Sequence, residues 1–115
     1  MKLIIAIIQP HSIDRVKQEL NQAGVTRLTV MDCQGFGRQL GKSGGVGTDE
    51  DVVNLRRKLQ LQIAVNDEFV NPTIEAIVRG ARSGTTGDIG DGKVFVVPLD
   101  EMVRIRTGER GPDAV

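Results

Sequence analysis

The sequence has no tryptophan and no tyrosine, and it has only one cysteine and one histidine. The lone Cys33 cannot form a disulfide within the chain, and no zinc-type cysteine spacing exists. With His11 as its only histidine, a single chain cannot assemble a histidine-based metal cluster or a Ser-His-Asp triad. The formal net charge is +0 and aromatic residues make up 3%, which argues against a nucleic-acid surface or a base-stacking platform.

Long apolar runs are also missing. The opening run LIIAII, residues 3–8, is too short for a signal peptide or a membrane span. We therefore expect a cytoplasmic protein without membrane insertion. At 115 residues, the chain is expected to form a single domain over residues 1–115, which is long enough to bury a core.

Glycine, in contrast, is abundant, and three glycines lead into an apolar run in the stretch TGDIGDGKVFVV, residues 86–97. Gly87, Gly90 and Gly92 allow a backbone to curl so that several N–H groups point at one anion. Lys93 adds a point charge suited to a phosphate. Arg104 and Arg106 are two residues apart, which would place them on one face of a strand. Together these residues predict a polyphosphate cradle.

The segment from Gly87 to Lys93 has the G-x-x-x-x-G-K spacing of a P-loop, but it is not one. Val94 stands where that motif needs Ser or Thr for magnesium, and a strand follows where a helix is required. No NTPase follows from the spacing. A flexible glycine turn between a helix and a strand is the alternative interpretation of the same stretch.

The hydrophobic pattern predicts two strand–helix–strand units. Strands are expected at 2–8, 25–34, 59–65 and 94–97, with a short additional strand through Val103 and Ile105. Ser12 is a candidate N-cap for a helix that Gly24 ends, and Pro72 is expected in the first turn of a second helix. Between the units, residues 36–56 are predicted to be a long flexible, glycine-rich loop.

This order predicts an α+β, ferredoxin-like domain, with a four-stranded antiparallel sheet and two helices on one face. The other face of the sheet would then be uncovered, although it is only partly polar. Burial against further copies of the chain would cover it, so we expect a homo-oligomer. Clefts between subunits would be natural ligand sites.

Three segments carry a family resemblance over essentially the whole chain: Gly35-Phe-Gly-Arg-Gln39, TGDIGDGKVFV and Arg104-Ile-Arg-Thr-Gly-Glu109. In this order and spacing the chain resembles the PII nitrogen-regulatory signal-transduction proteins. The resemblance implies a homotrimer with ATP or ADP in each of three inter-subunit clefts. It places Thr29 near the adenine, and the remaining expected nucleotide-binding residues are Gly37, Arg38, Gly87, Gly90, Asp91, Gly92, Lys93, Arg104 and Arg106.

The family also binds 2-oxoglutarate through nucleotide-bound Mg²⁺. The resemblance matches Gln39 to the residue that offers a carbonyl oxygen to the metal. It matches Lys58 to the residue that pairs with the far carboxylate, and Gly41 is expected beside them. From the residues alone, the favoured interpretation is that Gln39 is an ordinary polar loop residue and Lys58 a solvated strand edge.

The departures from the family pattern lie mainly in the long loop. The family's modified tyrosine has no counterpart, and Gly47 replaces the arginine that plugs an ammonium channel, which speaks against docking to such a channel. Asp88 stands where the family often has lysine, and its charge should weaken ATP more than ADP or AMP. The loop is therefore expected to serve another protein target, or another effector such as bicarbonate.

The sequence thus predicts a regulatory protein, not an enzyme, that acts on partners of nitrogen or carbon metabolism through its long loop. A slow ATPase is one alternative, because Asp88, Asp91 and Glu109 lie near the cradle, although no histidine, cysteine or serine constellation accompanies them. The other alternative is a structural or metal-tolerance trimer of similar architecture that binds no nucleotide.

Overall fold

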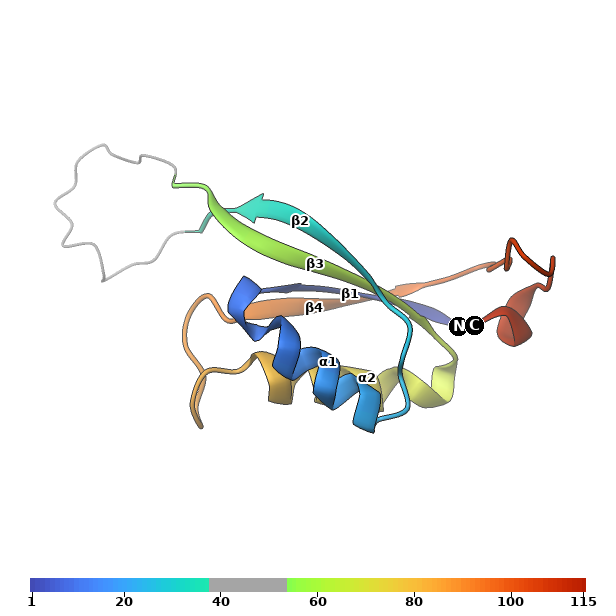
Figure 1. Cartoon of the computed structure of the whole chain (residues 1–115), viewed down its shortest axis with the longest axis horizontal. Coiled ribbons are helices and arrows are strands. Elements are labelled where there is room, and N and C mark those ends of the chain that lie inside the picture. The colour runs from blue at the N-terminus through green and yellow to red at the C-terminus, as the bar shows by residue number, and fades with distance from the viewer. Residues whose placement is uncertain (38–53) are drawn as a thin grey trace, which may run out of the picture.

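A computed structural model describes residues 1–37 and 54–115. Its elements form one sheet with two helices on one face (Figure 1). They run in the order β1 (Lys2–Ile8), η1 (Pro10–Ser12), α1 (Ile13–Gln22), β2 (Thr29–Gly35), β3 (Arg56–Val65), η2 (Asp67–Phe69), α2 (Val70–Ala81), β4 (Gly92–Pro98) and η3 (Gly111–Ala114). The sheet order is β2-β3-β1-β4, and every neighbouring pair is antiparallel. This confirms the predicted ferredoxin-like fold.

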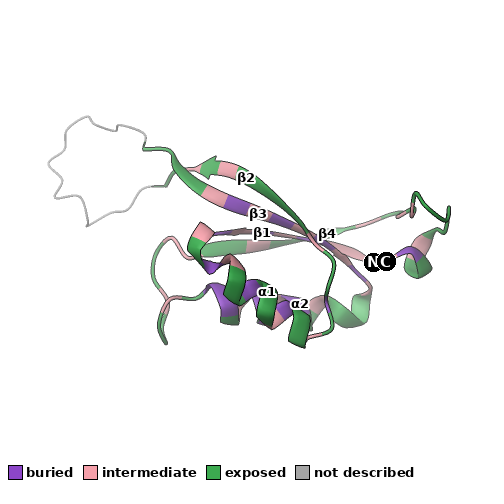
Figure 2. Ribbon diagram, viewed as in Figure 1, coloured by how far each residue is buried: buried purple, intermediate pink, exposed green. Residues whose placement is uncertain are grey.

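The two central strands show why the sheet has a buried face. In β1, Ile4, Ala6 and Ile8 are buried, and the residues between them are only partly buried. In β3, the buried positions are Leu59, Leu61, Ile63 and Val65, again at every second residue. The register places Ile4 opposite Ile63 and Val96, so these side chains share one face. The core lies between this face and the helices (Figure 2).

The end of α1 explains why β2 begins later than the sequence predicts. The N–H groups of Gly24 and Val25 donate to the carbonyl oxygens of Asn21 and Leu20, at 3.0 and 2.9 Å. With Gly24 at φ +84°, this is a Schellman motif. Val25 is consequently buried beside the helix end, and the strand starts at Thr29 instead of Val25.

The second helix begins at Val70, directly after the 3₁₀ turn η2, so Pro72 lies in its first turn as predicted. The helices meet at Gly80, where an added Cβ would lie 2.6 Å from the Cα of Val16. At the start of α1, Ser12 is the residue before the helix as predicted, but its hydroxyl makes no capping hydrogen bond. Neither α1 nor α2 is long and apolar enough to cross a lipid bilayer.

The opposite face of the sheet carries no helix among the described residues. Leu3, Ile5 and Ile7 of β1 point to this face and are only partly buried. Phe95 and Val97 of β4 lie next to them in the register and are exposed. This face is therefore more apolar than a solvated sheet face usually is.

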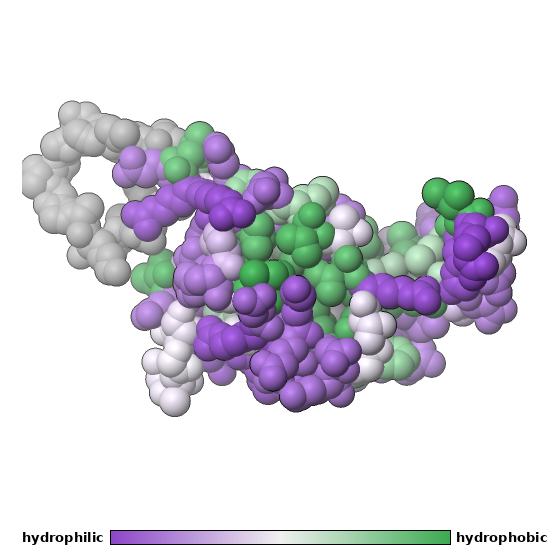
Figure 3. Space-filling model, in the orientation of Figure 1, coloured by the Kyte–Doolittle hydropathy of each residue, from purple (hydrophilic) through white to green (hydrophobic). Residues whose placement is uncertain are grey.

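The prediction of a short strand through Val103 and Ile105 is wrong. Val103 makes only an isolated bridge to Arg110. Between them the chain turns back, since Gly108 N–H donates to the Arg104 carbonyl at 2.7 Å and Arg104 N–H to the Glu109 carbonyl at 2.9 Å. Ile105 in this turn is 99% exposed, and apolar surface is visible at this end of the molecule in Figure 3.

Candidate functional site

Gly92 fixes where the glycine segment joins the sheet. It is the first residue of β4 and has φ +128°. A Cβ built on it would overlap the carbonyl oxygen of Ile7 on the neighbouring strand β1. Only glycine therefore lets the backbone approach β1 this closely, and the glycine predicted to cradle an anion has a structural requirement as well.

The carboxylate of Asp91 organises the turn in front of β4. One oxygen accepts from the Ser83 hydroxyl at 2.6 Å, and the other accepts from the backbone N–H groups of Ser83 and Asp88, both at 2.8 Å. These hydrogen bonds, the Ser83 hydroxyl first, hold the pKa of Asp91 below its ordinary value of 3.8. The structure places Asp91 as the acceptor that folds the segment, with its carboxylate occupied by backbone and hydroxyl donors.

Two side chains converge on the Gly90 carbonyl. Gln9 Nε2 donates to this oxygen at 2.8 Å, and Lys58 Nζ donates to it at 3.3 Å. Gln9 follows β1, and Lys58 lies on β3, so the glycine segment is tied to both central strands. Lys58 therefore has a described partner at the predicted site and is more than a solvated strand edge.

Lys58 and Lys93 share the open face of the sheet. Lys93 pairs with Ile7, and Ile7 pairs with Gln60, which is two residues from Lys58 on the same face of β3. The Lys93 ammonium lies 5.9 Å from the centre of the Phe95 ring. Two cations and the turn of the glycine segment thus meet at one end of the open face, an arrangement suited to an anion.

A hollow of about 560 Å³ lies on the other side of the glycine segment, and sequence reasoning missed it. Apolar side chains of α2 form much of its wall, namely Ile74, Ile77 and Val78, and Arg82, Asp88 and Lys93 also line it. Its α2 residues recur at helical spacing, which signals only a buried helix face. A cavity between that face and a loop has no sequence signature.

The two arginines of the predicted cradle lie far from the glycine segment. They follow β4, whereas the glycine turn at 87–91 precedes it, and the seven residues of β4 separate the two by about 20 Å (Figure 1). Arg104 and Arg106 also do not share a strand face, because Arg104 lies at the start of a turn and Arg106 within it. The expectation of one strand face carrying both is therefore wrong.

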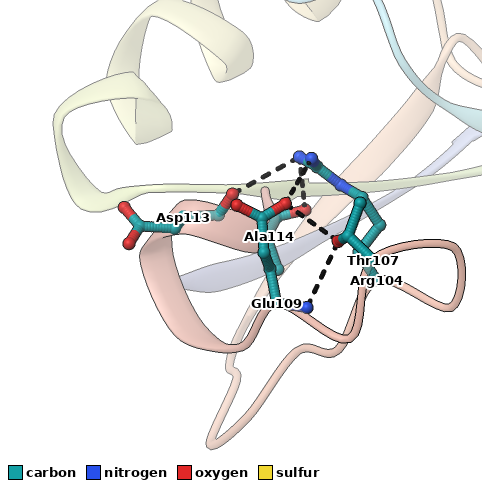
Figure 4. Close-up of polar contacts among 5 residues, drawn as sticks. All are labelled: Arg104, Thr107, Glu109, Asp113 and Ala114. Atoms are coloured by element: carbon teal, nitrogen blue, oxygen red, sulfur yellow. Dashed lines mark hydrogen bonds and ion pairs between the residues drawn. The ribbon is translucent and has the colours of Figure 1, made fainter.

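Arg104 and Arg106 differ in their surroundings. The Arg104 guanidinium pairs with Glu109 at 2.8 Å and reaches the carbonyl oxygens of Asp113 and Ala114 (Figure 4). Arg106 is exposed and makes no ion pair within residues 1–37 and 54–115. Of the two, Arg106 is the cation presented to solvent.

Thr29 lies on the opposite edge of the sheet. It opens β2 and pairs with Gln62 on the open face. Because β2 and β4 are the two edge strands, three strand spacings or about 14 Å separate Thr29 from the β4 side. Within one chain, Thr29, the glycine segment and the arginine turn thus lie in three separate places.

Some predicted residues fall outside the described parts of the chain. Gly37 is the last residue described before the gap, and Arg38, Gln39 and Gly41 lie beyond it. Within residues 1–37 and 54–115, no cluster of three or more His, Cys, Asp or Glu side chains could hold a metal ion. The predicted Mg²⁺ contact of Gln39 stays a prediction.

Comparison with known proteins gives consistent matches. The sequence profile of the family described as nitrogen regulatory protein P-II matches residues 1–109. Nitrogen regulatory protein GlnK1 of Methanosarcina mazei is 49% identical over 115 residues, which cover 100% of this chain and 97% of the relative. Nitrogen regulatory protein P-II of Azospirillum brasilense is 45% identical with 100% of both chains covered, and P-II 2 of Methanothermobacter thermautotrophicus is 46% identical with 100% and 97% covered.

Proposed function

Because the chain belongs to the nitrogen regulatory protein P-II family, we propose that it is a signal-transduction regulator that binds ATP or ADP in clefts between the subunits of a homotrimer. The bound state is passed to a partner protein of nitrogen or carbon metabolism through the segment between β2 and β3. 2-Oxoglutarate is the proposed co-effector, and bicarbonate is the alternative anion. The role is regulatory, not catalytic.

The separation of the two cationic groups supports clefts between subunits. Lys58 and Lys93 flank the glycine segment at one end of the sheet, and Arg106 stands beyond the other end. A polyphosphate is much shorter than the roughly 20 Å spanned by β4. It can meet both groups only if the arginine turn of one subunit approaches the glycine segment of the next.

The open face of the sheet supports the oligomer. Phe95 and Val97 are exposed on β4, and Leu3, Ile5 and Ile7 continue the apolar surface across β1. Each 100 Å² of apolar surface removed from water contributes about 2.5 kcal/mol. A head-to-tail interface between opposite ends of the chain generates a closed ring when the rotation closes, and a trimer is the smallest ring that does so without a two-fold axis.

The chemistry of the glycine segment supports a nucleotide as the ligand. Fixed lysines and turn N–H groups suit phosphates, and Thr29 lies on the same open face, where the neighbouring copy would be packed. Mg²⁺ would arrive with the phosphates and take Gln39 as a ligand. Lys58 is placed to exchange the Gly90 carbonyl for a carboxylate of the co-effector.

Calorimetric titration of ATP, ADP and AMP, each with and without Mg²⁺, 2-oxoglutarate and bicarbonate, tests the proposal. We expect Lys93→Ala to weaken ADP binding about tenfold, because a charge-assisted contact of about 1.4 kcal/mol is lost. Lys17→Ala on the exposed side of α1 is the matched control and should bind as the wild type. Absence of binding by all three nucleotides, or an unchanged affinity in Lys93→Ala, would refute the proposed site.

A further inference from the structure

The guanidinium of Arg104 already holds a carboxylate. Its Nη1 donates to Glu109 Oε1 at 2.8 Å, and its Nη2 donates to the carbonyl oxygens of Asp113 and Ala114 at 3.4 and 3.3 Å (Figure 4). The Arg104 side chain is 27% exposed, and that of Glu109 is 46% exposed. Two nitrogens of the guanidinium, a group that pairs readily with phosphates, are thus already engaged within the chain.

The turn itself aims Glu109 at Arg104. The Thr107 hydroxyl donates to Glu109 Oε1 at 2.9 Å, and the backbone N–H of Glu109 donates back to the Thr107 oxygen at 3.2 Å. The same turn is closed by two backbone hydrogen bonds, from Arg104 N–H to the Glu109 carbonyl and from Gly108 N–H to the Arg104 carbonyl. The carboxylate is therefore held in place by its own segment and does not depend on Arg104 alone.

We propose that Glu109 is an internal competitor for the anion site. It keeps Arg104 in a closed arrangement, and a bound phosphate must displace the Glu109 carboxylate before it can pair with Arg104. This inference rests on the proposed nucleotide function, because it concerns the arginine turn of the same cleft. Arg106, which carries no such carboxylate among the described residues, makes the first contact.

Displacement of Glu109 has a consequence for η3. Arg104 ties this turn through the Asp113 and Ala114 carbonyls, and Ala114 is only 1% exposed. When the guanidinium turns to a phosphate, those two carbonyls lose their donor. Ligand binding is thereby coupled to the freedom of residues 113–115, since the Val115 N–H···Pro112 hydrogen bond is long at 3.4 Å, whereas Gly111 and Pro112 stay bonded to Met102 and Asn66 at 2.9 and 3.2 Å.

Whether Glu109→Gln strengthens or weakens anion binding tests the competition. Glu109→Gln keeps the shape of the side chain and removes its charge, so we expect ADP and inorganic tripolyphosphate to bind about two- to fivefold more tightly, the range set by exposed ion pairs. Glu101→Gln is the matched control, because Glu101 pairs at 3.2 Å with Arg110 in the same region and leaves Arg104 untouched. It should bind with nearly wild-type affinity.

The alternatives give opposite results. If Glu109 only positions Arg104, then Glu109→Gln binds more weakly than the wild type or equally well, and the competition is refuted. If tripolyphosphate binding is tightened by Glu109→Gln while ADP does not bind at all, the competition stands and the nucleotide proposal fails. Absence of binding by both anions refutes both proposals.

Amide exchange gives a readout that does not depend on affinity. On addition of saturating ADP or tripolyphosphate to the wild type, the amides of 87–93 should gain protection and that of Val115 should exchange faster. In ligand-free Glu109→Gln, the Val115 amide should retain most of its protection, because Arg104 can still bond to Asp113 and Ala114. Slower exchange at Val115 on binding would show that η3 tightens instead, and would overturn the proposed coupling.

Discussion

At the residue scale, Gly92 has the least freedom to change. Gly92→Ala combines a backbone conformation that L-residues rarely adopt with an overlap between the new methyl group and the Ile7 carbonyl. We expect it to lower the free energy of unfolding by at least about 2 kcal/mol, since β1 and β4 must separate. Urea denaturation measures this as a lower midpoint at an unchanged slope.

Gly84→Ala provides the matched control for that measurement. Gly84 lies two residues before the glycine segment and also has a positive φ, +61°, but an added Cβ would meet no atom within 4 Å. Gly84→Ala should therefore lower the free energy of unfolding by only about 1 kcal/mol, the cost of a left-handed backbone conformation for alanine. Equal costs for the two variants would show that the overlap at Ile7 relaxes easily and does not fix the start of β4.

The sequence identified Gly92, Lys93 and Lys58 as site residues, and the structure gathers all three around the glycine segment. The spacing of Gly87, Gly90 and Gly92 before Lys93 is a local signal, and a strand start after a glycine turn follows from it. The role of Asp91 could not be predicted. Its main partner, Ser83, is eight residues away, and no short motif reports that a carboxylate will fold back on a turn.

At the scale of elements, the conformation of the glycine segment should depend on pH through Asp91. Its folded-state pKa lies below 3.8, so its hydrogen bonds stabilise the protein above that pH and are lost as the pH falls through the lowered pKa. Asp91→Asn should therefore lower the free energy of unfolding by about 1 kcal/mol at pH 7, a figure reduced because the carboxylate is exposed to solvent. The difference from the wild type should shrink progressively below about pH 4. Thermal denaturation at several pH values measures the difference.

Asp88→Asn removes the same charge from the same segment and serves as the control. The Asp88 side chain makes no hydrogen bond within the described residues, and only its backbone N–H is used. The free energy of unfolding of Asp88→Asn should equal that of the wild type at each pH. A gap between Asp91→Asn and the wild type that persisted at pH 2 would mean that the carboxylate charge is not what folds the segment.

The ends of the elements were harder to predict than their existence. A continuous apolar, β-branched run located β1, and the alternation of apolar with polar residues located β3. Val25 was wrongly included in β2, since its burial comes from a helix-capping motif and not from strand pairing. Val103 and Ile105 alternate with arginines, which is the pattern of a strand. The backbone hydrogen bonds that Arg104 makes with Gly108 and Glu109 close a turn there instead.

At the scale of the whole molecule, the chain distributes the expected site over three places. The sequence grouped the glycine segment with the arginines because only a dozen residues separate them along the chain. Most of β4 lies between Gly92 and Arg104 and carries the two groups to opposite ends of the sheet. Proximity in sequence is lost across a strand, whereas it is kept across a tight turn. The proposed site therefore requires the proposed assembly of several copies.

Subunit mixing tests that assembly directly. In a head-to-tail trimer, each cleft takes Lys93 from one subunit and Arg106 from the next, so Lys93→Ala and Arg106→Ala homotrimers should both bind ADP weakly. Trimers refolded from an equal mixture contain one intact cleft whenever both variants are present, which restores wild-type affinity in about a quarter of all clefts. Titration with ADP measures the restored fraction, and light scattering measures the trimer mass. If mixing restores no sites while the mixed trimers form, both residues act within one subunit, and the arrangement of the clefts that we propose is wrong.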